Sequence, residues 1–238
     1  MKALITWGGW DGHEPSLVAA QVSDMLQRHG YTTEVFDTLD CFDDWEKLSS
    51  FDLIVPVWTM SELTKERATN VSYAVARGTG LAGCHGGMCD AFRSNVLWQF
   101  MTGANWVAHP GGDGVSYTVK ITNPSHPLVA GIPDFEINSE QYYLHVDPAN
   151  DVLATTRFPR VSWYHSPNGT VDMPVAWTRF WGLGRVYYCA LGHKQNVIAS
   201  GPTYDMIDRG LIWAGQGKAL ARGNLHKLKE WENTFSNF

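Results

Sequence analysis

The sequence predicts an α/β protein with a doubly wound, mostly parallel sheet and an added antiparallel section. Over the first hundred residues, apolar runs of strand length alternate with segments of helical periodicity. Strands that alternate with helices form parallel sheets with right-handed crossovers. Beyond residue 115, shorter alternating segments lead to a glycine-bearing turn, which is typical of an antiparallel hairpin. We therefore expect helices on both faces, and ligands at the carboxyl ends of the parallel strands.

The first half of the chain supplies the parallel strands and their helices. The expected strands are residues 3–7, 32–36, 53–58 and 81–84. The third of these is apolar throughout, as in a strand covered on both faces. Pro15 suits the first turn of a helix that Gly30 ends. Ser61 is the expected cap of a second helix, which Gly78 closes.

The second half is less regular. Short strands are expected at residues 115–122, 135–137 and 152–155. A hairpin is expected with arms at residues 174–180 and 185–191, because Gly182 and Gly184 supply the positive φ of a tight turn. A final helix is expected over about residues 204–221.

Composition excludes several classes of protein. The net charge is −6, and the basic residues form no block, so we expect no nucleic-acid partner. The first apolar run is too short for a signal peptide, and no stretch approaches a membrane span. Four cysteines without a Cys-x-x-Cys pair fit a reducing compartment, so a cytoplasmic location is expected. The oligomeric state stays open, and a homo-oligomer is compatible with the sequence.

The sharpest motif is LAGCHGG at residues 81–87, an apolar strand that runs into small residues. Small residues around one reactive side chain are typical of a nucleophile elbow. In one reading the pattern is Gly-x-His-x-Gly with His85 at the apex, and in the other it is small-x-Cys-x-Gly with Cys84 as nucleophile. Two glycines relieve crowding around His85 more completely, so we expect His85 to be functional and Cys84 to be an inert, buried thiol. The backbone N–H of Gly86 can then bind developing negative charge.

Four further polar residues are candidates for the site. His193 directly follows a predicted strand, and Glu140 lies among polar and aromatic residues, where it can orient a histidine, act as a base or bind a metal. His13 and His109 lie on loops. Histidines from several loops can converge on Zn²⁺ or another divalent ion. The cofactor stays unknown, but a metal, if present, would come from His13, His85, His109 and His193.

The first glycine loop does not predict a nucleotide site. Residues 8–12 lack the Gly-x-Gly-x-x-Gly spacing of dinucleotide-binding loops, so we expect no nucleotide. Trp10 and Trp58 lie at or just after strand ends, where a cleft is expected. Aromatic faces there suit a sugar ring, which stacks through its C–H faces.

The motifs of the second half are similar to those of the ThuA-like family, named for trehalose utilisation. The matching segments are residues 123–128, 131–135, 139–142, 174–179, 184–193 and 210–214. The elbow resembles that of the class I glutamine-amidotransferase-like superfamily, which has a flavodoxin-like fold and includes the PfpI group. The resemblance covers nearly the whole chain and implies one ThuA-like domain over residues 1–238. The main departure is Cys84, where ThuA-like sequences usually carry an aliphatic residue.

This resemblance implies a role in the catabolism of a disaccharide or keto-sugar. A hydrolase, lyase or isomerase would use histidine acid/base or metal-assisted chemistry on a small carbohydrate. By the resemblance, His193 supplies a partner histidine beside the elbow. Two alternatives are a Cys84-dependent PfpI-like hydrolase or amidotransferase, and a non-catalytic sugar-binding protein. The expected catalytic residues are His85, His193 and Glu140, and the expected substrate-binding residues are Trp10, His13, Trp58, Gly86 and His109.

Overall fold

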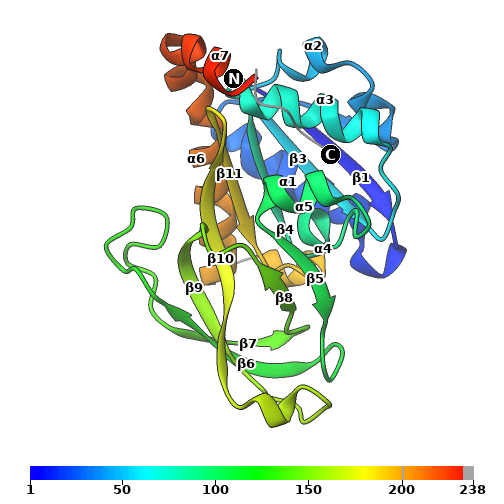
Figure 1. The fold of residues 1–238 in the computed structure, drawn as a ribbon. Coiled ribbons are helices and arrows are strands. Elements are labelled where there is room, and N and C mark those ends of the chain that lie inside the picture. The colour runs from blue at the N-terminus through cyan, green and yellow to red at the C-terminus, as the bar shows by residue number, and fades with distance from the viewer. Residues whose placement is uncertain (200, 233–238) are drawn as a thin grey trace.

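The largest element of the protein is a mixed sheet. The structure is a computed structural model that describes residues 1–199 and 201–232; the rest of the expected domain, residues 200 and 233–238, lies outside the described residues. Within the described ranges, nine strands pair in the order β2-β1-β3-β4-β11-β10-β9-β6-β7 (Figure 1). This arrangement confirms the predicted doubly wound sheet with an added antiparallel section.

One half of the sheet is parallel. Its strands are β1 (Lys2–Gly9), β2 (Thr32–Phe36), β3 (Leu53–Thr59), β4 (Gly80–Cys84) and β11 (Gly184–Cys189). After β1 the chain crosses to β2 on one side of it, then returns to β3 on the other side. Such a reversal of strand order creates the crevice in which α/β sheets bind ligands. β4 lies between β3 and β11, so the elbow follows a central strand, as predicted.

The other half of the sheet is antiparallel. Its strands are β6 (Val115–Ile121), β7 (Phe135–Ser139), β9 (Asp151–Phe158) and β10 (Val171–Trp181), and β10 forms the predicted hairpin with β11. A separate two-stranded sheet pairs β5 (Ala104–Ala108) with β8 (Tyr143–Val146). No pattern in the sequence predicts this small sheet, because short strands of this kind depend on a distant partner for their hydrogen bonds.

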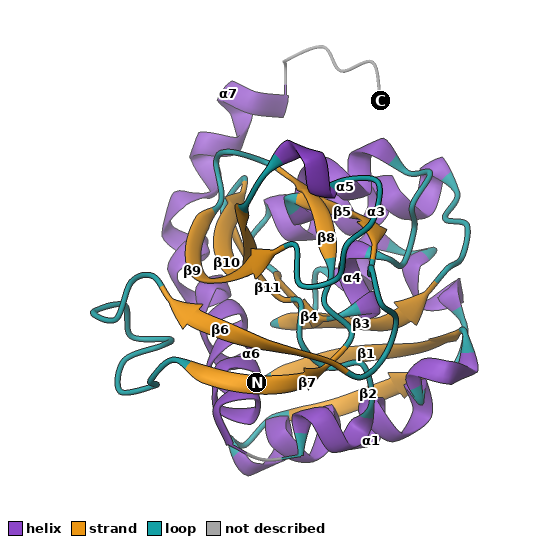
Figure 2. Ribbon diagram, turned by 90° about the horizontal axis from the view of Figure 1, so that it is seen from below, coloured by secondary structure: helices purple, strands orange, loops and turns teal. Residues whose placement is uncertain are grey.

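Helices cover both faces of the parallel half, as Figure 2 shows. The long helices α1 (Pro15–Arg28) and α6 (Gly201–Ala221) lie on one face, and α3 (Lys65–Ala76) and α5 (Val96–Thr102) lie on the other. Shorter helices are α2 (Trp45–Leu48), α4 (Gly86–Cys89) and α7 (Leu228–Glu232), with 3₁₀ turns at Asp11–His13, Leu39–Phe42, Ser166–Asn168, Gln195–Ile198 and Arg222–Lys227. Among the described helices, none is long and apolar enough to cross a membrane.

The start of α3 corrects one expectation. Ser61 does not cap this helix; its backbone N–H donates to the carbonyl of Ala91 instead, at 2.8 Å. The cap is Thr64, whose hydroxyl accepts a hydrogen bond from the N–H of Arg67 at 3.2 Å. Both residue types can cap a helix, and the contact with the segment after α4 keeps residues 61–63 out of the helix.

Candidate functional site

The turn after β4 has an unusual backbone conformation at His85. Its φ is 50° and its ψ is −129°, a region that residues with a side chain seldom adopt. The surroundings hold it there: the N–H of His85 donates to the Cys189 carbonyl at 2.7 Å, and the hydroxyl of Tyr188 donates to the His85 carbonyl at 2.8 Å. A Cβ on Gly87 would lie 2.6 Å from the Pro56 carbonyl oxygen, so the turn requires glycine there. His85 therefore stands at the apex of the elbow.

Cys84, one residue earlier, points into the packed interior. Its side chain is buried, and its Sγ would lie 3.2 Å from a Cβ on Gly192. Burial, with a smaller contribution from Cys189, raises the pKa of the Cys84 thiol to about 12. Because the thiolate is the reactive form of cysteine, this environment makes Cys84 a poor nucleophile.

We expect Cys84→Ser to leave ligand and metal binding nearly unchanged, at a modest cost in stability from burying a hydroxyl. With a pKa of about 12, the native thiol should react with iodoacetamide slowly at neutral pH, because its thiolate fraction is roughly a thousandfold below that of a free cysteine. Peptide mass spectrometry measures this rate, with urea-unfolded protein as the fully labelled control. Rapid labelling of native Cys84 with parallel loss of function would support the thiol mechanism instead.

The imidazole of His85 is held in one orientation. Its Nδ1 lies 2.9 Å from the Ala190 carbonyl oxygen. A carbonyl can only accept, so Nδ1 carries the proton and Nε2 presents its lone pair. That Nε2 lies 3.1 Å from Oε2 of Glu140, while the ring stacks on Tyr142 with centroids 3.9 Å apart.

Two more histidines face the same oxygen of Glu140. Nδ1 of His193 lies 3.3 Å from Oε2, and its Nε2 lies 3.4 Å from a carboxylate oxygen of Asp113. Nε2 of His13 lies 3.8 Å from Oε2, and its Nδ1 contacts the Thr59 hydroxyl at 2.9 Å. Each histidine thus has one nitrogen held by an outer partner and the other turned toward Glu140. Metal-ligating histidines are oriented in this way.

These four residues form a compact set of metal-ligand atoms. His13, His85, Glu140 and His193 are all buried, and one ligand atom from each lies within 4.8 Å of the others. The distances from Oε2 of Glu140 to the three nitrogens are 3.1, 3.3 and 3.8 Å. A tetrahedral zinc ion with bonds of about 2.05 Å has ligands separated by about 3.3 Å. The donor set therefore fits a four-coordinate divalent ion.

The charge balance also calls for a cation. Burial lowers the pKa of His85 to about 4, and its hydrogen bond to Glu140 offsets only part of that effect. Burial alone would raise the pKa of Glu140, but the three neighbouring imidazoles of His13, His193 and His85 outweigh it and hold this pKa below its ordinary range. At neutral pH, a neutral imidazole therefore turns a lone pair toward an ionised carboxylate. Two acceptors in contact are stable only when a proton or metal ion lies between them.

His109 lies beside this group and outside it. His109 is one of the four histidines predicted as metal ligands, whereas the four clustered residues are the other three histidines together with Glu140. Nε2 of His109 lies 3.8 Å from the other carboxylate oxygen, Oε1, and 36% of its side chain is exposed. His109 therefore stands between the buried group and the solvent.

The remaining predicted site residues differ in their positions. The ring of Trp10 meets His13 edge-on, with centroids 4.8 Å apart. A Cβ on Gly86 would lie 2.7 Å from Nδ1 of His13, so the missing side chain leaves room for that imidazole. The ring of Trp58 packs across Gly8 on the neighbouring strand β1.

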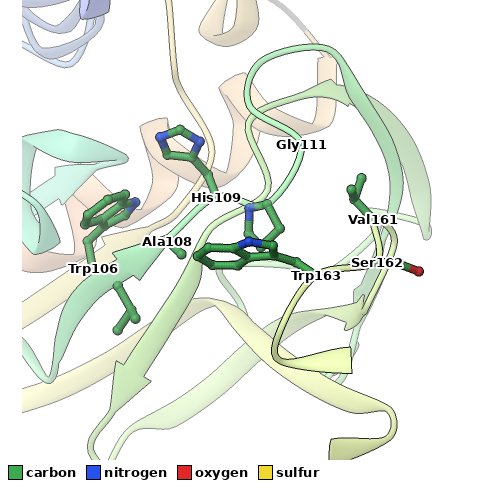
Figure 3. Close-up of a pocket in the computed structure, with 9 residues that line it drawn as sticks. Trp106, Ala108, His109, Gly111, Val161, Ser162 and Trp163 are labelled. Atoms are coloured by element: carbon green, nitrogen blue, oxygen red, sulfur yellow. The ribbon is translucent and has the colours of Figure 1, made fainter. Parts of the chain in front are cut away.

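Several residues around the group were missed at the sequence level. Tyr142 stacks on His85, Thr59 contacts His13, and Asp113 contacts His193. No local pattern in the sequence marks these three residues for such roles. A second omission is an open pocket of about 390 Å³ lined by residues 106–111 and 161–163 (Figure 3). Trp106 lies on the short strand β5 and Trp163 on the loop between β9 and β10, and no periodic signal marks either residue as part of a pocket.

The fold and site define a doubly wound α/β protein with a histidine at the elbow after β4 and a buried His/Glu group beside it. The family model for ThuA, described as trehalose utilisation, matches residues 2–214. The chain therefore belongs to the ThuA family. A search of curated proteins gave no significant match.

Solved structures share this fold at low sequence identity. A ThuA-like protein from Bacteroides uniformis aligns with a TM-score of 0.71 at 18% identity, over 90% of this chain and 91% of that one. One from Parabacteroides merdae gives 0.68 at 17% identity, over 92% and 91%. A cytoplasmic protein from Salmonella typhimurium gives 0.59 at 12% identity, over 90% and 98%. At these identities the likeness shows the fold alone.

Proposed function

We propose that this protein is a carbohydrate-processing enzyme that binds one divalent metal ion, such as Zn²⁺, at His13, His85, His193 and Glu140. The observation that carries the proposal is the convergence of these four ligand atoms, with an outer partner holding each histidine. The family description, trehalose utilisation, supports a disaccharide or its keto derivative as the substrate class. A cytoplasmic location, as for the Salmonella neighbour, belongs to the same proposal.

In this proposal the four-residue group holds the metal ion and His109 transfers a proton. A metal ion held here would supply a Lewis acid, and a hydroxyl or carbonyl oxygen of the sugar would have to enter as a fifth ligand in order to be polarised. His109 is partly exposed and contacts Oε1 of Glu140, so it is placed to exchange a proton with the substrate. Hydrolysis, elimination and isomerisation of a keto-sugar all need this pairing of a polarised oxygen with a proton-transferring group.

The elbow contributes through its rigidity. Hydrogen bonds to both its N–H and its carbonyl hold His85 in place, and the Tyr117 hydroxyl anchors the Glu140 carbonyl at 2.9 Å. Ligands fixed in advance lose little entropy when the ion binds. The two carboxylate oxygens are thereby kept in separate roles, Oε2 toward the ligand nitrogens and Oε1 toward His109.

Elemental analysis tests the metal directly. Protein purified without a metal-affinity step is expected to contain about one divalent ion per chain. Chelator-treated protein should take up about one equivalent of Co²⁺ and show the intense visible absorption of tetrahedral cobalt. Protein that carries no metal and takes up neither Zn²⁺ nor Co²⁺ at micromolar concentration would contradict the proposal.

Turnover separates the enzyme from a non-catalytic sugar-binding protein. The metal-loaded protein is incubated with trehalose, other disaccharides and their 3-keto derivatives, and products are followed by NMR. An enzyme converts at least one of them, and His109→Ala slows that conversion while leaving the metal content unchanged. Saturable binding of a sugar without conversion of any would favour the binding protein.

A further inference from the structure

The pocket beside His109 is a site of its own. Residues 106–111 form one side, at the end of β5 and in the loop after it, and residues 161–163 form the other, in the loop between β9 and β10. Its volume of about 390 Å³ lies within the range of small-molecule sites, about 300–1,000 Å³. Figure 3 shows the indole rings of Trp106 and Trp163 and the imidazole of His109 around this space. We call this site the aromatic cleft.

The aromatic cleft adjoins the candidate metal centre through His109. His109 lines it and also lies 3.8 Å from Oε1 of Glu140. Tyr142 extends the connection, because it stacks on His85 at 3.9 Å and lies 6.2 Å from Trp106, both measured between ring centroids. A ligand in the cleft that touches His109 is therefore separated from the metal ligands by the His109 side chain alone.

The two tryptophans differ in how they are held. The guanidinium of Arg93 lies 3.9 Å from the ring centroid of Trp106, and Arg93 is itself ion-paired with buried Asp90, so this wall is rigid. Trp163 is 54% exposed, although its backbone N–H donates to the Ser166 hydroxyl at 2.9 Å. An exposed indole on an anchored backbone is a stacking surface that costs little entropy to use.

The lining favours a sugar over a hydrocarbon ligand. Within the part of the chain that the structure describes, Nε1 of Trp106 and Nδ1 of His109 are buried without a hydrogen-bond partner. Both atoms are covered by protein, so the cleft presents to a ligand the indole faces and the partly exposed imidazole of His109. The indole faces meanwhile suit the C–H faces of a pyranose ring.

We propose that the aromatic cleft binds the second pyranose ring of a disaccharide whose first ring reaches the metal centre. This inference rests on the proposed function and names the part of the substrate that the protein selects. Trp163 is the stacking surface and Trp106 is the fixed opposite wall. The substrate class is then a disaccharide or its keto derivative, and a free monosaccharide binds less tightly because it leaves the cleft empty.

Isothermal titration calorimetry with trehalose, maltose, cellobiose, sucrose and glucose tests the cleft. We expect at least one disaccharide to bind about tenfold more tightly than glucose, and Trp163→Ala to remove that advantage. Trp163→Phe, which keeps an aromatic face, should restore most of it. Trp231→Ala is the matched control, because Trp231 is 46% exposed on α7, far from the cleft (Figure 1).

Metal content measured on the same samples separates the two proposals. A Trp163→Ala protein with normal metal content and no disaccharide preference supports the cleft. Equal affinities of the wild type for glucose and every disaccharide, or a preference that survives Trp163→Ala, would overturn it whatever the metal content. A Trp163-dependent preference in a protein without metal would leave the cleft standing and refute the metal centre.

Discussion

Replacing His85 with alanine should abolish metal binding. The change removes one of four ligand atoms and leaves the Ala190 carbonyl without the Nδ1–H that it accepts. Loss of an outer partner alone typically weakens metal affinity 10- to 100-fold, so loss of a ligand should exceed about 100-fold. The unpaired buried carbonyl should also lower the free energy of unfolding of the metal-free protein by about 1–3 kcal/mol.

The measurement is zinc titration of the chelator-treated protein, with competition against a coloured chelator. Because His85→Ala can fail to fold, His85→Asn provides a second variant: asparagine adopts positive φ more readily than most residues that have a side chain, and it lacks the imidazole. His29→Ala is the matched control, since His29 is exposed at the carboxyl end of α1 and pairs with Asp208. Folded His85→Asn protein that binds zinc as tightly as the wild type would refute the role of His85.

Glu140→Gln should weaken metal binding without lowering the stability of the metal-free protein. Glutamine has nearly the same shape, but it removes the negative charge that all three ligand histidines face. Its amide can donate to a neutral imidazole nitrogen, so the metal-free variant should be at least as stable as the metal-free wild type. The variant should nevertheless lose at least about 100-fold in metal affinity, because it no longer neutralises the ion.

Thermal unfolding with and without zinc measures both effects. At a free metal concentration about 1,000 times its Kd, the wild type gains about 4 kcal/mol of stability, whereas a variant with 100-fold weaker affinity gains about 1.4 kcal/mol. Glu136→Gln is the control, because Glu136 is an exposed carboxylate on β7, the strand that ends just before Glu140. An equal stabilisation of wild type and Glu140→Gln by zinc would show that the carboxylate does not contact the ion.

The elbow illustrates how much of the site local sequence can predict. Small residues on both sides of His85 are a local requirement of the turn, and Gly87 is needed because a Cβ there would meet a backbone carbonyl. His193 follows β11, and His13 follows β1, in the same way that His85 follows β4. Because the carboxyl ends of parallel strands lie at one edge of a sheet, the sequence pattern could predict that these three histidines approach one another.

The alternation of apolar strands and amphipathic helices also predicted the parallel half of the sheet, and the glycine turn predicted the β10–β11 hairpin. These features depend on periodicity and turn chemistry, which act over a few residues. The start of α3 shows the limit of such signals. Ser61 and Thr64 are both suitable caps, and a tertiary hydrogen bond to Ala91 decided between them.

By itself, then, the sequence determined the parallel sheet, the turn at His85 and the histidines at the strand ends, because each follows from local backbone geometry. Only the tertiary structure decided that Glu140, which follows the edge strand β7, meets those histidines, and that Trp163 rather than Trp58 lines a cleft beside them. The path of the antiparallel strands and their loops depends on packing between residues far apart in the chain. No period or spacing in the sequence carries that information.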